Sequence, residues 1–212
     1  MENYEKETIA AIATALSDSG IGIVRISGEN AIYIVDSIFR SASGKKILTK
    51  VQSHMIHYGY IVDKDENIID EVMTSVMKAP KSYTMEDTVE INCHGGVLVM
   101  QKVLETVLQA GARLAEPGEF TKRAFLNGRI DLSRAEAVID VIHSQNEYAL
   151  SSSVSQLKGR LSDKIRSLRE DILYQIAFIE SALDDPEHIS LEGYPEPVSY
   201  THLRAHETEA DL

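Results

Sequence analysis

The sequence lacks tryptophan altogether and has little of several other residue types. Its 212 residues include one cysteine, Cys93, and five prolines, and aromatic residues make up 6% of the chain. A single cysteine excludes a disulfide framework within the chain, which is typical of proteins of a reducing cytosol. No apolar run reaches the roughly 18–20 residues of a membrane span, and the charged first residues do not resemble a secretory signal. We therefore expect a cytoplasmic protein with no membrane segment.

Basic residues and nucleotide-binding motifs are also scarce. There are 33 acidic against 21 basic residues, which gives a formal net charge of -12. This excess argues against nucleic-acid binding over the whole surface, because phosphate contact needs concentrated Lys and Arg. The sequence contains no GxxxxGK[ST] phosphate loop and no GxGxxG motif, so it offers no recognisable site for a nucleoside triphosphate.

Residues 1–117 alternate strand and helix signals and predict a mixed α/β domain. Polar residues 63–67 predict a turn between two strands. Gly111 is a typical C-terminal cap for the helix expected over 97–109. A helix from Ala31 through Phe39 is indicated by its apolar spacing. The other expected elements are strands over 20–27, 55–62, 68–77 and 88–93 and a helix over 97–109.

Residues 118–197 have almost no strand signal and predict a partial all-α domain, so the fold class is α+β. A short helix ends at Asn127-Gly128, and Ser133 with Glu136 indicates a capping box for the next one. One helix of about 50 Å is expected over 147–183, with an apolar stripe that must pack on an ordinary bundle, a further segment or a second subunit. Residues 198–212 fit no element and are expected to be a non-native or disordered tail.

Arg25 is the first candidate site residue. It lies between Val24 and Ile26 in a strand, so its side chain must point to the opposite face from both neighbours. Such an arginine either faces solvent or binds an anion or carbonyl group at the edge of a pocket.

Glu90 is the second candidate, because it shares one strand face with Asn92 and His94. A carboxylate accepts two parallel hydrogen bonds from a ring N–H and a neighbouring amine, as in pterins and guanine. The alternative is that Glu90 pairs with a nearby Lys or Arg. One His and Cys93 are too few for a zinc site, so no metal site is predicted.

The third candidate segment, residues 116–132, joins the two regions and carries Lys122, Arg123 and Arg129 within eight residues. Ligand sites are common between domains. The alternative is a solvated hinge.

These segments together resemble the family of tRNA modification GTPases called MnmE or TrmE. The likeness covers about residues 7–197, in order and at consistent spacing, which makes it far more specific than one short motif. The matching stretches are 7–11, 22–28, 82–84 with 86–87, Glu90 with 94–96, 117–132, 135–137 and 140–142.

The resemblance implies a tetrahydrofolate-binding, aminomethyltransferase-like domain that binds 5-formyltetrahydrofolate as a one-carbon carrier and forms a homodimer. It implies a helical domain interrupted by a GTPase domain that uses GTP, magnesium and potassium. It also implies joint action with the FAD-dependent partner MnmG (GidA), which with this enzyme forms the 5-carboxymethylaminomethyl group on the wobble uridine of tRNA. The sequence is expected to stop before the GTPase domain, so GTP hydrolysis would belong to the longer enzyme.

By position, the resemblance places the folate contacts on Arg25, Glu90 and Arg129, and it assigns no catalytic residue. Many members have Lys where Arg129 stands, which keeps the charge but not the planar fork. Two other functions stay open: a stand-alone folate-dependent one-carbon transferase, with Asn92 and His94 as weak acid candidates, and a non-catalytic dimerisation module.

Overall fold

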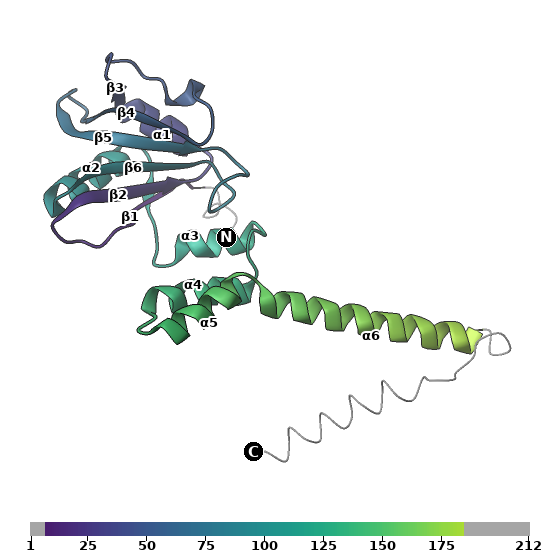
Figure 1. Cartoon of the computed structure of the whole chain (residues 1–212). Coiled ribbons are helices and arrows are strands. Elements are labelled where there is room, and N and C mark those ends of the chain that lie inside the picture. Colours follow the sequence, from purple (N-terminus) through teal and green to yellow (C-terminus); the bar gives the residue numbers. More distant parts are fainter. Residues whose placement is uncertain (1–6, 185–212) are drawn as a thin grey trace. The chain divides into compact units, whose positions relative to one another are not determined.

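The computed structural model describes residues 7–184, which divide after Leu157 into two compact units (Figure 1). The predicted tail over 198–212 lies outside the described residues. Proposed domain boundaries at 117 and 197 stay predictions.

The first unit is built on one mixed sheet of seven strands (Figure 1). The spatial order is β3-β4-β5-β6-β2-β1-β7, and all neighbours are antiparallel except the parallel pair β1 and β7. The strands are β1 Ile9–Ile12, β2 Ser19–Ser27, β3 Phe39–Ser41, β4 Met55–Val62, β5 Ile68–Met77, β6 Thr88–Gly95 and β7 Arg113–Leu114.

Helices α1 (Ala31–Ile38) and α2 (Val97–Gln109) pack on the sheet and form the core with it. Val24 and Ile26 on β2 and Ile91 on β6 are fully buried in this core. Because strand side chains alternate, the residues between them lie on the opposite face. That second face carries the candidate site residues Arg25 and Glu90.

The remaining helices follow the sheet in sequence. They are α3 Glu119–Leu126, α4 Leu132–His143, α5 Glu147–Leu157 and α6 Arg160–Asp184. Helices α4 and α5 contact each other, and α6 belongs to the second unit. The structure therefore confirms an α+β fold in which a mixed sheet domain precedes a helical part.

Three local predictions were wrong. The expected single helix over 147–183 is broken, because Gly159 adopts φ +86°, a left-handed conformation that ends α5 and that few other residues tolerate. The cap of α4 is Asp131, whose side chain accepts a hydrogen bond from the Arg134 N–H at 2.9 Å, in place of the predicted Ser133. Helix α1 ends at Ile38, and Phe39 begins β3.

Within residues 7–184, none of the helices is long and apolar enough to cross a membrane.

Candidate functional site

An ion pair between two neighbouring strands forms the centre of the candidate site. Arg25 on β2 lies directly opposite Glu90 on β6. Its Nε donates a hydrogen bond to Glu90 Oε1 at 2.8 Å, and its Nη2 lies 2.7 Å from the same oxygen in an ion pair. The side chains are 29% and 22% exposed, so solvent and ligands still reach the pair.

Two aromatic rings hold the arginine of this pair. The Arg25 guanidinium carbon lies 5.5 Å from the ring centre of Tyr83 and 5.7 Å from that of Phe120, the second residue of α3. Arg129 joins the same cluster, with its guanidinium carbon 4.8 Å from the Tyr83 ring centre. Cations are attracted to ring faces at such distances. Tyr83 therefore connects the two predicted arginines.

Hydrogen bonds connect Tyr83 and Thr84 to α3 and to the residues just after this helix. The Tyr83 hydroxyl lies 2.9 Å from the Thr121 hydroxyl, and Arg129 Nη1 donates to the Tyr83 carbonyl at 2.9 Å. Asn127 Nδ2 donates to the carbonyl of Thr84 at 2.6 Å. These bonds fix the position of the ring relative to the ion pair.

Glu90 keeps one carboxylate oxygen available for a ligand. Oε1 accepts the hydrogen bond from Arg25 Nε and forms the ion pair with Nη2, whereas no described residue donates to Oε2. An open carboxylate oxygen beside an oriented arginine fits the chemistry of a pterin edge, which offers a ring N–H and an amine. Charged and aromatic groups next to each other also suit a flat, polar ring system.

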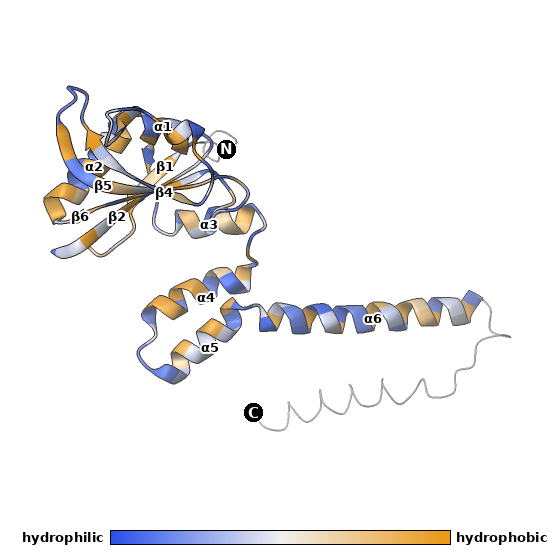
Figure 2. Ribbon diagram, turned by 45° about the horizontal axis from the view of Figure 1, so that its top comes forward, coloured by the Kyte–Doolittle hydropathy of each residue, from blue (hydrophilic) through white to orange (hydrophobic). Residues whose placement is uncertain are grey.

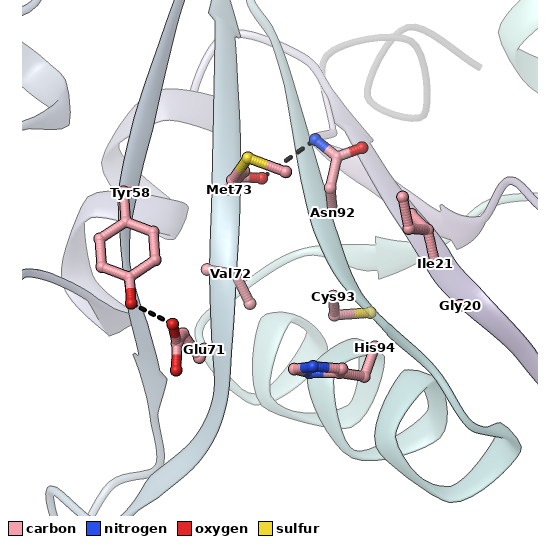
Figure 3. A pocket seen from close by; sticks show the side chains of 9 residues that line it. All are labelled: Gly20, Ile21, Tyr58, Glu71, Val72, Met73, Asn92, Cys93 and His94. Atoms are coloured by element: carbon pink, nitrogen blue, oxygen red, sulfur yellow. Dashed lines mark hydrogen bonds between the residues drawn. The ribbon is translucent and has the colours of Figure 1, made fainter.

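A shallow hollow continues along the same sheet face from Glu90. It is lined by Gly20, Ile21, Tyr58, Glu71, Val72, Met73, Asn92, Cys93 and His94 (Figure 3). Asn92 donates from Nδ2 to the Met73 carbonyl at 3.0 Å, and the Tyr58 hydroxyl donates to Glu71, so these polar groups have partners within the sheet.

His94 also has a partner. Its Nδ1 lies 2.7 Å from Asp70 Oδ1, and its backbone N–H donates to Asp70 Oδ2 at 2.8 Å. The hydrogen bond to this carboxylate raises the pKa of His94 above its usual value. Cys93 points into the core, and burial raises the pKa of its thiol to about 11, so the thiol is protonated and unreactive at neutral pH.

A second hollow opens on the other side of the ion pair. Tyr83 and Arg129 line it together with His54, Met77, Pro80, Lys81, Ser82 and Met85. The Arg25–Glu90 pair thus has Tyr83 on one side and Asn92, two residues further along β6, on the other.

A buried charge cluster supports the site from α3. Arg123 Nη1 donates to both oxygens of Glu86 at 3.1 and 3.2 Å, and its Nη2 donates to Glu119 at 3.0 Å. Glu119 also accepts two bonds from Arg113 and one from the Glu116 backbone N–H. Burial opposes ionisation of Glu119, but these hydrogen bonds outweigh it and lower its pKa to about 2.

The structure therefore places Lys122, Arg123 and Arg129, which lie within eight residues of the sequence, in different environments. Arg25 and Arg129 both lie against the Tyr83 ring, and Glu90 is joined to them through its pair with Arg25. Arg123 is buried in the charge cluster, and Lys122 lines a different hollow beside it. Sequence reasoning missed the roles of Tyr83 and Phe120. Their only signal was their place within the matching stretches 82–84 and 117–132.

Across the described part of the chain, the structure holds no group of three or more His, Cys, Asp or Glu side chains placed to bind a metal ion.

Comparison with known proteins adds to this geometry. Residues 8–129 match the family model described as the GTP-binding protein TrmE N-terminus, and residues 132–208 match the MnmE helical domain. The chain is 64% identical over 188 residues to a tRNA modification GTPase MnmE from Lachnoclostridium phytofermentans, which covers 89% of this chain and 41% of that protein.

Two further relatives with the same name show the same partial coverage. The protein from Geobacillus kaustophilus is 56% identical over 189 residues, which is 89% of this chain and 41% of the relative. The protein from Bacillus mycoides is 53% identical over 205 residues, or 95% of this chain and 44% of the relative. The chain thus spans less than half the length of these relatives.

Proposed function

Because this chain belongs to the TrmE (MnmE) family of tRNA modification GTPases, we propose that its open sheet face binds a reduced folate, 5-formyltetrahydrofolate. The observation that carries the proposal is that Arg25 and Arg129 share the Tyr83 ring while Arg25 also pairs with Glu90. These residues lie far apart in the sequence, and the sheet register and the segment around Tyr83 bring them together.

Each residue has a distinct task in this proposal. Glu90 accepts hydrogen bonds from the pterin ring N–H and amine through its open Oε2 and its oriented carboxylate plane. Arg25 holds that plane in position through its hydrogen bond and its ion pair to Oε1. Arg129 is exposed and binds a carbonyl or carboxylate group of the folate, and Tyr83 positions both arginines.

The bound folate supplies a one-carbon unit to the reaction of the longer enzyme. In our proposal that enzyme acts in the cytoplasm with the FAD-dependent partner MnmG on the wobble uridine of tRNA, and it hydrolyses GTP with magnesium and potassium. The present chain contributes folate binding and homodimer formation. Exposed Tyr58, Met73 and Ile21 on the open sheet face support the second role, because apolar surface of this kind marks contact sites (Figure 3).

A stand-alone one-carbon transferase has less support. Its acid candidates, Asn92 and His94, are already engaged with the Met73 carbonyl and with Asp70. We therefore assign the chain a binding role and no catalytic residue.

Calorimetric titration with (6S)-5-formyltetrahydrofolate tests the proposal, with the parent chain measured beside Glu90→Ala. Removing one partner of a charge-assisted hydrogen bond costs about 1.5–3 kcal/mol, or roughly ten- to a hundredfold in affinity. We expect binding by the parent and a loss of this size in the variant.

A matched control is Glu105→Ala, which removes an exposed carboxylate on α2 that accepts hydrogen bonds from Lys102 and Gln109 of the same helix. It should bind the folate as the parent does. A folded parent chain that gives no heat of binding would refute the folate assignment, and equal affinity of the parent and Glu90→Ala would refute the role of Glu90.

A further inference from the structure

The hollow that Tyr83 and Arg129 line together, called the basic hollow below, differs in charge from the rest of this acidic chain. Its lining includes Lys81 and Arg129 and no carboxylate from the described residues. The hollow on the Asn92 side of the ion pair contains Glu71, and the hollow beside α3 contains several glutamates. Because the chain has 33 acidic against 21 basic residues, a hollow with cations alone favours an anionic ligand.

Both cations of the basic hollow keep donors for a ligand. Lys81 is exposed, and no carboxylate within residues 7–184 pairs with its ammonium group. Arg129 is also exposed and uses Nη1 for the Tyr83 carbonyl at 2.9 Å, whereas a guanidinium carries five N–H groups. The hollow has a volume of about 650 Å³, which is within the range of about 300–1,000 Å³ for small-molecule sites.

Hydrogen bonds hold the backbone around Lys81 in place. Residues 78–87 connect β5 to β6 and pass beside α3 as a mainly hydrophilic segment (Figure 2). The Lys81 N–H donates to the Lys78 carbonyl at 3.1 Å, and the Lys78 N–H donates to Ser53 Oγ at 2.9 Å. Asp87 accepts a backbone N–H of the same segment at 2.8 Å. A ligand therefore meets a wall that is already formed, which lowers the entropic cost of binding.

A strand face leads from Glu90 to the basic hollow. Ser75 on β5 lies directly opposite Glu90, and Met77, two residues further along β5, lines the hollow. Alternate residues of a strand share a face, and two residues span about 7 Å. A ligand bound by Glu90 can thus extend past Met77 into the basic hollow or past Asn92 toward Glu71. The anionic tail of a folate is attracted by the first direction and repelled by the second.

We propose that the basic hollow binds the γ-glutamyl tail of the folate, so that the preferred ligand is a folate polyglutamate. This inference rests on the proposed folate site and adds the direction in which the ligand lies. Each further γ-linked glutamate leaves one more free carboxylate on the tail. Arg129, which shares the Tyr83 ring with Arg25, binds a carboxylate near the ring system, and Lys81 binds the carboxylates of the added glutamates.

Calorimetric titration of the 212-residue chain with the mono- and triglutamate forms of (6S)-5-formyltetrahydrofolate tests the tail site. The triglutamate should bind about two- to tenfold more tightly, as expected of one or two exposed ion pairs. In Lys81→Ala the ratio of the two affinities should fall below about twofold. Lys45→Ala removes an exposed lysine outside the hollow and should keep the ratio of the parent chain.

The tail site and the folate site fail in different ways in this experiment. Equal affinity of the parent chain for both forms overturns the tail site and leaves the folate site standing. A preference for the triglutamate that survives Lys81→Ala, or that Lys45→Ala removes equally, also overturns it, because the attraction then does not come from this hollow. A folded chain that binds neither form refutes the folate site, and the tail site with it.

Modification of lysine side chains locates the tail without any substitution. Saturating triglutamate should slow the acetylation of Lys81 more than saturating monoglutamate does, as measured by mass spectrometry. The rate at Lys45 in the same sample should be unchanged, since this lysine lies outside the hollow. Equal rates at Lys81 with the two forms contradict a contact between Lys81 and the added glutamates.

Discussion

The cluster around Arg123 and the pair of Arg25 with Glu90 use the same two side-chain types. The Arg123 and Glu119 side chains are 6% and 9% exposed, and protein groups satisfy their charges. Arg25 and Glu90 are about a quarter exposed, and Glu90 keeps an oxygen without a bond from any described residue. The comparison teaches that burial and complete hydrogen bonding indicate a structural role for the Arg123 cluster, whereas incomplete bonding beside aromatic rings is the feature on which the proposed ligand site at Arg25 and Glu90 rests.

Arg123→Ala should produce the largest loss of stability. It removes the cation that pairs with the partly buried Glu86 and one of the two cations that pair with the buried Glu119, which keeps Arg113. Removing one partner of a buried ion pair costs about 3–5 kcal/mol. Urea unfolding followed by circular dichroism measures the effect. The matched substitution Arg25→Ala should cost only about 1 kcal/mol, and equal losses for the two would break the comparison.

Lowering the pH should destabilise the cluster around Arg123, because Glu119 becomes protonated. Because the pKa of Glu119 falls from 4.5 to about 2 on folding, its stabilisation is present above pH 4.5 and is lost as the pH falls toward 2. The free energy of unfolding should fall by about 3 kcal/mol across this window from this group. Glu119→Gln should show a shallower acid dependence than the parent, and an unchanged slope would argue against the shift.

Tyr83→Leu should weaken folate binding. The change removes the ring face that both Arg25 and Arg129 contact, and two exposed cation–π contacts are worth about 1–2 kcal/mol, or roughly five- to thirtyfold in affinity. Calorimetry measures the loss. Tyr83→Phe keeps the ring and loses only the bond to Thr121, so it should bind nearly as the parent does.

Arg129→Lys should have the smallest effect. The charge is retained, but the planar fork that donates to the Tyr83 carbonyl and stacks on its ring is lost. We expect affinity to fall by about 0.5–1 kcal/mol, or roughly two- to fivefold, with unchanged urea stability. A loss as large as that of Glu90→Ala would show that Arg129 has a stronger direct contact than its position indicates.

Short strands were the main part of the fold that sequence reasoning missed. Strands β4 and β5 match their predicted bounds, because their apolar and β-branched residues form long local patterns. Strands β1, β3 and β7 have four residues or fewer, so they are too short for such a pattern. Each of them forms by pairing with a neighbouring strand of the sheet, and this pairing cannot be inferred from the local sequence.

The sequence by itself determined which strand face Arg25 and Glu90 occupy. Val24 and Ile26 around Arg25, and Ile91 after Glu90, place both charged residues on the solvent-accessible face, because strand side chains alternate. The family resemblance singled out Arg25, Glu90 and Arg129 as a set.

Only the tertiary structure decided how these residues meet. The register of β2 and β6 sets Arg25 opposite Glu90, 65 residues away, and the segment around Tyr83 brings in Arg129. The tertiary structure also buries and pairs Arg123 but leaves Arg129 exposed, although the two residues are only six positions apart in the sequence. Burial and pairing depend on distant parts of the chain, so no local pattern distinguishes the buried, paired Arg123 from the exposed Arg129 that we propose binds a ligand.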